Sequence, residues 1–248
     1  GPEILEYLNH VADKFDLKDY INFEEEVIQA KFNEDSCLWS VSTNKQKYVT
    51  KFCIFATGCL SIPNKPEIPG LESFEGELLH TATWPREEQN FTDKNVAIIG
   101  TGSSSIQTIP EIAKDVKNLY VFQRTPNYSI PSNNGPMDKD VEAQVKARYS
   151  EFRKENSLNG FGLASLSDEA MISESDLEEV NSQFEENWNT SGLAFFGGYA
   201  DIPVDVNSNE VAANFVRNKI KEIVSDQETA EKLCPKYHIG GKRLCVDT

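Results

Sequence analysis

The cysteines of this 248-residue chain form no pattern that binds metal or carries redox chemistry. Their number is odd, and no two of them have the spacing of a C-x-x-C motif. This disfavours a disulfide framework, a metal site and a redox dithiol, and with the dithiol a disulfide reductase. We expect most of them to act as small apolar side chains in a reducing cytoplasm. The five are Cys37, Cys53, Cys59, Cys234 and Cys245.

Long apolar runs and positive charge are also missing. No run approaches the roughly 18 apolar residues of a transmembrane helix, and Gly1-Pro2 leads into a charged amphipathic segment rather than a secretory signal. The formal net charge is −16, from 24 basic and 40 acidic residues. Because an acidic chain repels phosphate backbones and anionic lipids, we expect no nucleic acid and no membrane as a partner. A cytoplasmic location fits these absences best.

The strongest local pattern lies in residues 95–124. The apolar runs 96–99 and 119–122 are typical of buried parallel strands, and a helical apolar period separates them. Gly100 and Gly102 stand where the first strand meets the helix. A glycine at the first position permits a tight turn, and one at the second lets the backbone approach a pyrophosphate. The stretch therefore predicts a Rossmann-type unit that binds a dinucleotide at the helix N-terminus.

Residues at both ends of this unit refine the expected ligand. Ser105 stands where the pattern has a third glycine or alanine, so the match is imperfect although serine is still small. The second strand ends in Gln123-Arg124-Thr125, where NAD-binding units usually carry an acid for the ribose hydroxyls. Arg124 offers a planar fork of donors and Thr125 a hydroxyl, which favours NADPH over NADH. A surface arginine in a solvated loop is the alternative.

The N-terminal part predicts a helix followed by a small antiparallel sheet. Residues 3–15 have the apolar spacing of an amphipathic helix, and residues 21–23 suggest a short strand. Turn-forming residues then separate three alternating segments, which predict a β-meander. An extended linker is expected at 61–70, where three prolines and a glycine occur. The three meander strands are 27–32, 38–43 and 48–55.

Residues 136–235 are charged and favour helices. Helix N-caps are expected at 173–176 and at Ser208-Asn209. Phe161, residues 193–196 and Tyr199 supply apolar surface, which we assign to a core in preference to a substrate passage. Gly192, Gly197 and Gly198 are expected to break helices. The predicted helices cover 139–156, 175–187, 209–224 and 228–233.

A motif in the linker identifies a family resemblance. Phe74, Gly76, His80, Trp84 and Pro85 match every fixed position of F-x-G-x-x-x-H-x-x-x-W-P. This is the fingerprint of the Baeyer–Villiger monooxygenases, a class of flavin-dependent enzymes similar to cyclohexanone monooxygenase. The strand that runs into Ala56-Thr57-Gly58 resembles the hinge of two-domain flavoproteins. The resemblance implies a structural or hinge role for His80 and the fingerprint.

The resemblance also implies roles for residues outside the fingerprint. The glycine turn resembles the loop that holds the NADPH pyrophosphate, and residues 122–127 resemble the clamp for its 2′-phosphate. The C-terminal segment resembles G-x-K-R-L-x-x-D, in which the lysine contacts the phosphate and the arginine faces the flavin as a catalytic residue. The implied cofactor-binding residues are Gly100, Thr101, Gly102, Ser103, Ser104, Gln107, Arg124, Thr125 and Lys242, and the implied catalytic residue is Arg243.

We therefore expect an α/β fold, with a Rossmann-like NADPH domain that carries a large helical insertion and follows a partial FAD-domain segment. The family's first FAD-binding glycine turn is absent before residue 58, so a central fragment that does not retain FAD is expected. The expected segments are the FAD-domain piece (1–60), the fingerprint linker (61–92), the Rossmann core (93–135), the helical insertion (136–235) and the active-site segment (236–248).

The intact enzyme implied by the resemblance uses NADPH, FAD and O2 to insert one oxygen atom next to a ketone carbonyl, which yields an ester or lactone. The fragment alone is expected to be inactive. Two alternatives remain open from the sequence. One is a flavin monooxygenase that oxygenates nitrogen or sulfur, which Trp84-Pro85 disfavours. The other is a non-catalytic module that binds NADP.

Overall fold

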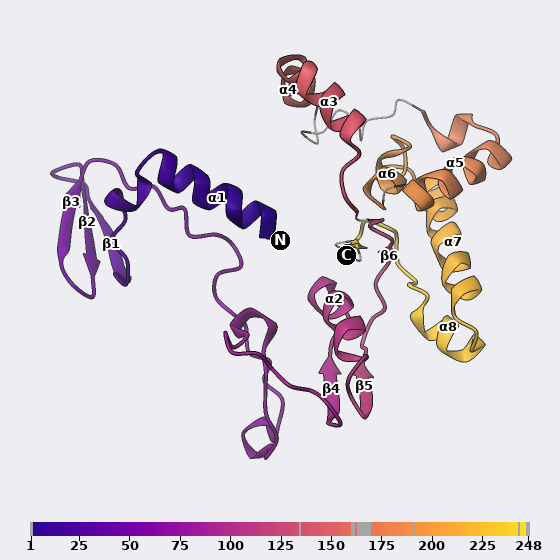
Figure 1. The fold of residues 1–248 in the computed structure, drawn as a ribbon, viewed down its shortest axis with the longest axis horizontal. Helices are drawn as coiled ribbons and strands as arrows, with labels where there is room; N and C mark the ends of the chain where they lie inside the picture. The colour runs from indigo at the N-terminus through magenta and orange to yellow at the C-terminus, as the bar shows by residue number, and fades with distance from the viewer. Residues whose placement is uncertain are drawn as a thin grey trace. The chain divides into compact units, whose positions relative to one another are not determined.

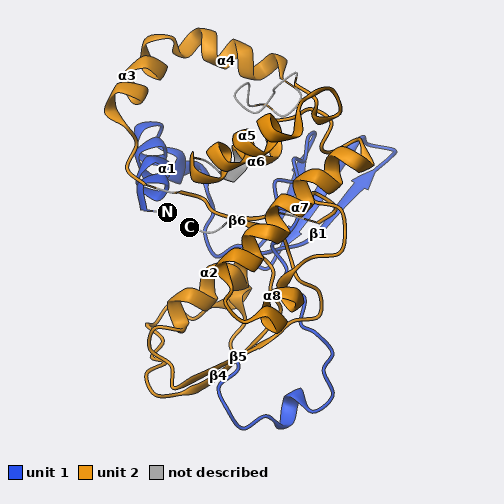
Figure 2. Cartoon of the chain, turned by 90° about the vertical axis from the view of Figure 1, so that its right-hand side faces the viewer, with its two compact units in different colours: residues 1–78 blue, residues 79–248 orange. Residues whose placement is uncertain are grey.

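A computed structural model describes residues 2–133, 135–159, 162, 170–190, 192–242 and 244–246. The chain divides into two compact units, residues 1–78 and 79–248 (Figure 2). The first unit holds an antiparallel sheet, and the second holds parallel strand pairs with helices. The expected α/β fold class is confirmed. The division between the units falls inside the expected linker, 61–92. In the described part of the chain, no helix is long and apolar enough to cross a bilayer.

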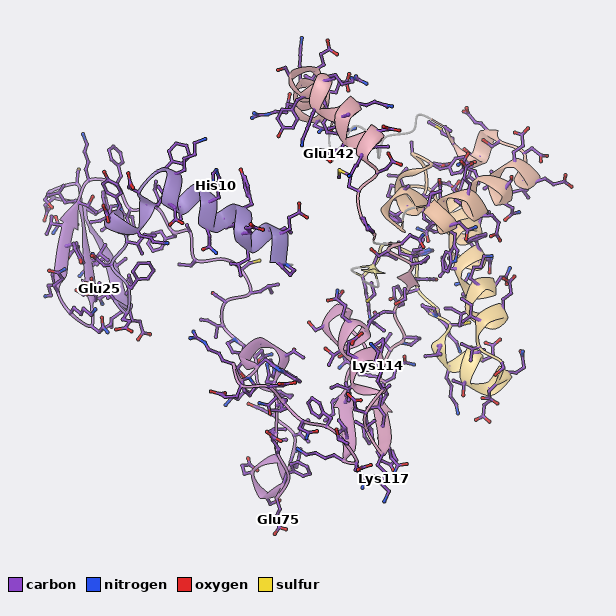
Figure 3. All side chains as sticks on the ribbon, viewed as in Figure 1. His10, Glu25, Glu75, Lys114, Lys117 and Glu142 are labelled. Carbon is purple, nitrogen blue, oxygen red and sulfur yellow. The ribbon has the colours of Figure 1, made fainter. Side chains whose placement is uncertain are left out.

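The first unit begins with α1 (Pro2–Lys14), which confirms the predicted amphipathic helix. His10 lies on this helix and is exposed (Figure 3). The strand predicted at 21–23 is wrong, because a 3₁₀ turn, η1 (Leu17–Tyr20), precedes it and Lys18 O accepts the Ile21 N–H at 3.3 Å. Glu24 then adopts a φ of 56°, a left-handed conformation through which a strand cannot continue.

The predicted meander is confirmed as β1 (Val27–Asn33), β2 (Leu38–Thr43) and β3 (Lys47–Thr50), which pair antiparallel in chain order. The third strand ends at Thr50 and not at residue 55. Thr50 pairs with Trp39, and β2 begins only one residue earlier, at Leu38. Strand β2 therefore has no residues with which the chain up to residue 55 could pair. Glu25, which is labelled in Figure 3, ties the sheet to the preceding loop. Its carboxylate accepts from Thr43 Oγ1 at 2.7 Å and from Tyr48 OH at 2.9 Å.

The second unit contains the predicted strand–helix–strand segment. It consists of β4 (Asn95–Ile99), α2 (Ser103–Ile112) and β5 (Asn118–Phe122). The strands are parallel and in register from Asn95↔Asn118 to Ile99↔Phe122, and they lie side by side with α2 following β4 (Figure 1). Because the helix connects two parallel strands, its N-terminus lies at the carboxyl edge of the sheet, where Rossmann units bind ligands.

Helices dominate the rest of this unit. The single helix predicted over 139–156 is broken at Arg148, whose φ and ψ of −116° and 28° leave the helical region. A short helix begins at Gly192 and ends at Gly197, two of the glycines that were expected to break helices. The helices are α3 (Lys139–Ala147), α4 (Tyr149–Leu158), α5 (Leu177–Thr190), α6 (Gly192–Gly197), α7 (Val206–Ile223) and α8 (Gln227–Leu233).

Ser208 and Asn209 do not cap a helix as predicted. The N-cap of α7 is Asp205, whose carboxylate accepts the Ser208 N–H at 2.8 Å, so the helix starts earlier. Ser208 and Asn209 are buried in its first turn. The cap expected within 173–176 is supported, because Asp176 accepts the Glu178 N–H at 2.8 Å.

The core of the second unit is an aromatic cluster between α5, α6 and α7. Phe184 and Phe195 are fully buried with ring centroids 4.8 Å apart, and Phe195 stacks on Phe215 at 5.4 Å. Tyr199 meets Phe184 edge-on at 5.6 Å. The assignment of Phe195 and Tyr199 to a core is confirmed, whereas Phe161 lies outside the described residues.

A buried carboxylate, Asp201, joins this core to the start of α7. Its oxygens accept the N–H groups of Ile172 and Ser173 at 2.9 and 3.0 Å and the hydroxyl of Ser208 at 2.7 Å. Burial alone would raise the pKa of Asp201. The hydrogen bonds from Ser173, Ser208 and Ile172 outweigh burial and lower the pKa from its ordinary 3.8 to about 2.

Asp201→Asn is expected to destabilise the fold by about 2 kcal/mol at neutral pH. The amide replaces one accepting oxygen with an NH2 group, which would face the N–H and O–H groups that donate to the carboxylate. The carboxylate stabilises the fold fully above its unfolded pKa, and this contribution is lost as the pH falls through the folded value. The difference in free energy of unfolding between wild type and variant should therefore shrink below about pH 4. Urea unfolding between pH 7 and pH 3 measures it, and a difference that stays constant over this range would contradict the assignment.

Candidate functional site

The turn between β4 and α2 is shaped by two glycines with different roles. Gly100 has a φ of 100°, a conformation that residues with a Cβ rarely adopt, and its N–H donates to Phe122 O at 2.9 Å. Gly102 has ordinary backbone angles and is the N-cap of α2. A Cβ on Gly102 would meet no heavy atom within 4 Å, so the approach to the helix N-terminus is open. Gly100 therefore provides the positive φ that the turn needs, and Gly102 keeps the approach to the helix N-terminus open.

The N-terminus of α2 presents backbone donors to this opening. Ile106 N donates to Gly102 O at 3.0 Å, which is the first bond of the helix. The N–H groups of Ser103, Ser104 and Ser105 precede it and have no partner within the helix. Together with the positive end of the helix dipole, they form a site suited to an anion.

A cleft of about 370 Å³ lies in front of these donors. Among the described residues that line it, Lys242 alone is charged, and it comes from the far end of the chain. The cleft therefore combines a helix N-terminus with an ammonium group, which together suit a phosphate. Its lining residues are Gly102, Ser103, Ser104, Ser105, Asn127, Lys242 and Cys245.

Lys242 is brought to the cleft by the segments before and after it. After it, β7 (Cys245–Val246) pairs in parallel with β6 (Ser129–Ile130), and Cys245 N donates to Tyr128 O at 2.9 Å. Before it, Tyr128 OH donates to Tyr237 O at 2.8 Å. Tyr128 is 1% exposed, and this burial raises its pKa, which keeps the phenol protonated as a donor.

The other expected nucleotide-binding residues lie at different distances from the cleft. Thr101 is buried and its hydroxyl donates to Thr125 O at 3.4 Å, which ties the turn to the segment after β5. Arg124 is exposed beside Thr125 and does not line the cleft. Gln107 lines a second cleft of about 570 Å³, between α2 and residues 81–91. Arg243 lies outside the described residues.

The fingerprint residues are divided between the two units. In the first, a Cβ on Gly76 would lie 2.5 Å from the tip of the Phe74 ring, so a side chain there would displace this exposed ring. In the second, His80 Nδ1 accepts the Ala82 N–H at 3.1 Å and caps η3 (Thr81–Thr83). Trp84, which precedes Pro85, contacts Phe91 with ring centroids 6.1 Å apart. His80 thus caps a local turn.

The sequence did not single out Asn127 and Cys245, which line the cleft, or Tyr237, which donates a hydrogen bond to Asn127. Asn127 lay within the segment 122–127 without an assigned role. Tyr237 precedes the motif that contains Lys242, and Cys245 occupies one of the variable positions of that motif. No periodicity or spacing relates them to the glycine turn. In the described ranges, no group of three or more His, Cys, Asp or Glu side chains is arranged to hold a metal.

Comparisons with known proteins match the chain over nearly its whole length. Residues 1–241 match the family described as pyridine nucleotide-disulphide oxidoreductase. The chain is 39% identical over 249 residues to a Baeyer–Villiger monooxygenase of Pseudooceanicola batsensis, and 38% identical over 250 residues to a cyclohexanone 1,2-monooxygenase of Acinetobacter. It covers 98–99% of its own length in these matches but 45–46% of theirs. It therefore spans about half the length of these curated relatives.

A solved structure agrees with these relatives. The crystal structure of an OTEMO complex with FAD and NADP superposes with a TM-score of 0.94 at 34% identity. The superposition covers 100% of this chain and 48% of that one. The resemblance to Baeyer–Villiger monooxygenases predicted from the fingerprint is therefore confirmed.

Gly100→Ala is expected to lower the free energy of unfolding by about 1–2 kcal/mol, because the Cβ opposes a positive φ. Gly102→Ser is the matched control, since serine is a favoured N-cap and its Cβ enters open space. Chemical denaturation compares both variants with wild type. If Gly100→Ala were as stable as Gly102→Ser, the strain assigned to the turn would be wrong.

Proposed function

This chain belongs to the pyridine nucleotide-disulphide oxidoreductase family, and we propose that it is the NADPH-binding part of a Baeyer–Villiger monooxygenase. The observation that carries the proposal is the position of Lys242 in front of the α2 N-terminus. A disulfide oxidoreductase activity is not proposed, because no two of the five cysteines form a C-x-x-C motif.

The residues present fit a dinucleotide phosphate. The N–H groups of Ser103–Ser105 are positioned to donate to pyrophosphate oxygens, and Gly102 leaves room for the backbone to approach them. The Lys242 ammonium supplies a positive charge at the same opening. We assign Arg124 and Thr125, at the end of β5, to the 2′-phosphate that distinguishes NADPH from NADH.

Flavin and oxygen chemistry belong to the proposed whole enzyme. When bound, FAD would accept a hydride from NADPH and use O2 to insert an oxygen atom next to a ketone carbonyl, with an ester or lactone as product. The one dinucleotide turn of this chain is assigned to NADPH, so no flavin site is assigned within it. Arg243, which follows Lys242, is assigned by its motif to stabilise the negative charge that develops during oxygen insertion.

Product analysis tests the proposed reaction. The full-length protein that carries this chain, supplied with FAD, NADPH, O2 and cyclohexanone, is expected to form the lactone with consumption of NADPH. An amine or sulfide that is oxygenated while no ketone is converted would favour the nitrogen- or sulfur-oxygenating alternative. NADPH binding without flavin binding or turnover would favour the non-catalytic module.

Arg124→Ala is expected to remove a preference for NADPH. A charge-assisted hydrogen bond contributes about 1.5–3 kcal/mol, which corresponds to a preference of roughly ten- to a hundredfold over NADH. Calorimetric titration with both nucleotides, on wild type and variant, measures the change. Wild type that binds both equally, or a variant with unchanged preference, would refute the role assigned to Arg124.

Arg243→Ala and Lys242→Ala are expected to separate oxygen insertion from nucleotide binding in the full-length enzyme. Loss of the arginine should leave the KM for NADPH largely unchanged and lower the rate of ester formation by about 10²–10³. Loss of the lysine should chiefly raise the KM for NADPH. Steady-state kinetics with both ester and NADPH quantified distinguishes the two. Ester formation at the parental rate in Arg243→Ala would overturn the assignment.

A further inference from the structure

Asn127 connects the glycine turn to the segment that carries Lys242. Its amide Nδ2 donates to Thr101 O at 2.6 Å, and its Oδ1 accepts from Tyr237 OH at 3.0 Å. Thr101 lies between the two glycines of the turn, and Asn127 lines the cleft. One side chain therefore bonds both the glycine turn and the segment that precedes Lys242.

These two bonds determine which way the Asn127 amide faces. A tyrosine hydroxyl that donates must meet the amide oxygen, so the amide nitrogen is left to face the Thr101 carbonyl. In the opposite orientation two oxygens would oppose each other there. An amide nitrogen carries two N–H bonds, and only one is used on Thr101. The second is available as a donor to a ligand in the cleft that Asn127 lines.

Tyr237 is itself held in place. Its carbonyl accepts from Tyr128 OH, and its ring meets the buried Tyr128 ring edge-on with centroids 5.3 Å apart. Arg217 Nη1 donates in turn to the Tyr128 hydroxyl at 3.0 Å. The other face of the site is also coupled to this ring, since Lys242 Nζ lies 5.0 Å from the Tyr237 centroid. The hydroxyl that orients Asn127 is therefore positioned before any ligand arrives.

We propose that Asn127 donates a hydrogen bond to the pyrophosphate of the bound dinucleotide, and that Tyr237 is a positioning residue that orients the Asn127 amide. This proposal rests on the proposed NADPH-binding function and adds a side-chain donor to it. In this orientation the Asn127 amide nitrogen also donates to the Thr101 carbonyl oxygen. The negative end of that carbonyl, which would repel an anion in the cleft, is therefore hydrogen-bonded.

Calorimetric titration of the full-length protein with NADP⁺ and NAD⁺ tests the roles proposed for Asn127 and Tyr237. Asn127→Ala and Tyr237→Phe are each expected to raise the Kd about three- to tenfold, the value of one net hydrogen bond. Asn127→Asp should raise it further, because a carboxylate cannot donate and repels phosphate. Both nucleotides should be affected equally, since the pyrophosphate is common to them.

The double variant is the decisive measurement. If Tyr237 acts through Asn127, adding Tyr237→Phe to Asn127→Ala should change the Kd no further. Tyr237→Phe retains the ring that packs on Tyr128 and Lys242, so a thermal midpoint close to that of wild type should accompany its loss of affinity. A merely structural role would produce additive losses or a lowered midpoint with unchanged Kd, and either result would overturn the proposal.

The same titrations separate this proposal from the proposed function. Arg124→Ala should weaken NADP⁺ alone, whereas the Asn127 and Tyr237 variants should weaken both nucleotides. Wild type that binds neither nucleotide would refute the NADPH-binding function and this proposal with it. Wild type that binds NADP⁺ while Asn127→Ala binds it equally well would refute the Asn127 contact and leave the function standing.

Discussion

The candidate site depends on the contact between the segment after β5 and the C-terminal segment. Tyr128 is the centre of this contact: its carbonyl accepts from Cys245, its hydroxyl donates to Tyr237, and Arg217 of α7 donates to that hydroxyl. Without it, Lys242 would have no fixed relation to a turn that lies about 140 residues earlier in the chain. Because these groups are buried, breaking one of them leaves polar atoms unsatisfied, which makes the contact cooperative.

The helical part of the second unit contributes to the same arrangement. Asn209, buried in the first turn of α7, donates to Ile239 O at 2.9 Å and accepts the Ile239 N–H at 3.0 Å. This pair of bonds fixes the backbone three residues before Lys242. The aromatic cluster and Asp201 hold α7 in turn. The helical segment of the second unit therefore has a direct structural use, which is to support the segment that carries Lys242 at the cleft.

Electrostatics favours an anion at the cleft. The chain has a net charge of −16, which opposes the approach of an anionic dinucleotide. Salt screens charges beyond about 10 Å, so distant acidic residues matter less than the groups at the site itself. There, the helix N-terminus and Lys242 supply positive potential at short range. A phosphate ligand is thus favoured locally by an otherwise acidic protein.

The sequence predicts features that depend on neighbouring residues better than features that depend on residues far apart in the chain. The amphipathic α1, the meander and the β4–α2–β5 segment follow from periodicity and turn residues, because neighbours in the chain create those patterns. The two glycines of the turn also follow from local requirements, which are a positive φ at Gly100 and an open approach at Gly102. The predicted strand at 21–23 failed because a left-handed Glu24 and a 3₁₀ turn leave no mark on hydrophobic spacing. Motif resemblance, and not pattern, pointed to Lys242.

What only the tertiary structure decided is which distant residues meet. Asn127 and Tyr237 are 110 residues apart, and each is an ordinary polar or aromatic residue in its own segment. Their hydrogen bond exists because β6 and β7 pair and because α7 anchors Ile239, and both are long-range contacts. The burial that raises the Tyr128 pKa and lowers that of Asp201 is also a product of packing. A one-dimensional pattern records the spacing of residues along the chain, whereas hydrogen-bond orientation and desolvation depend on positions in space.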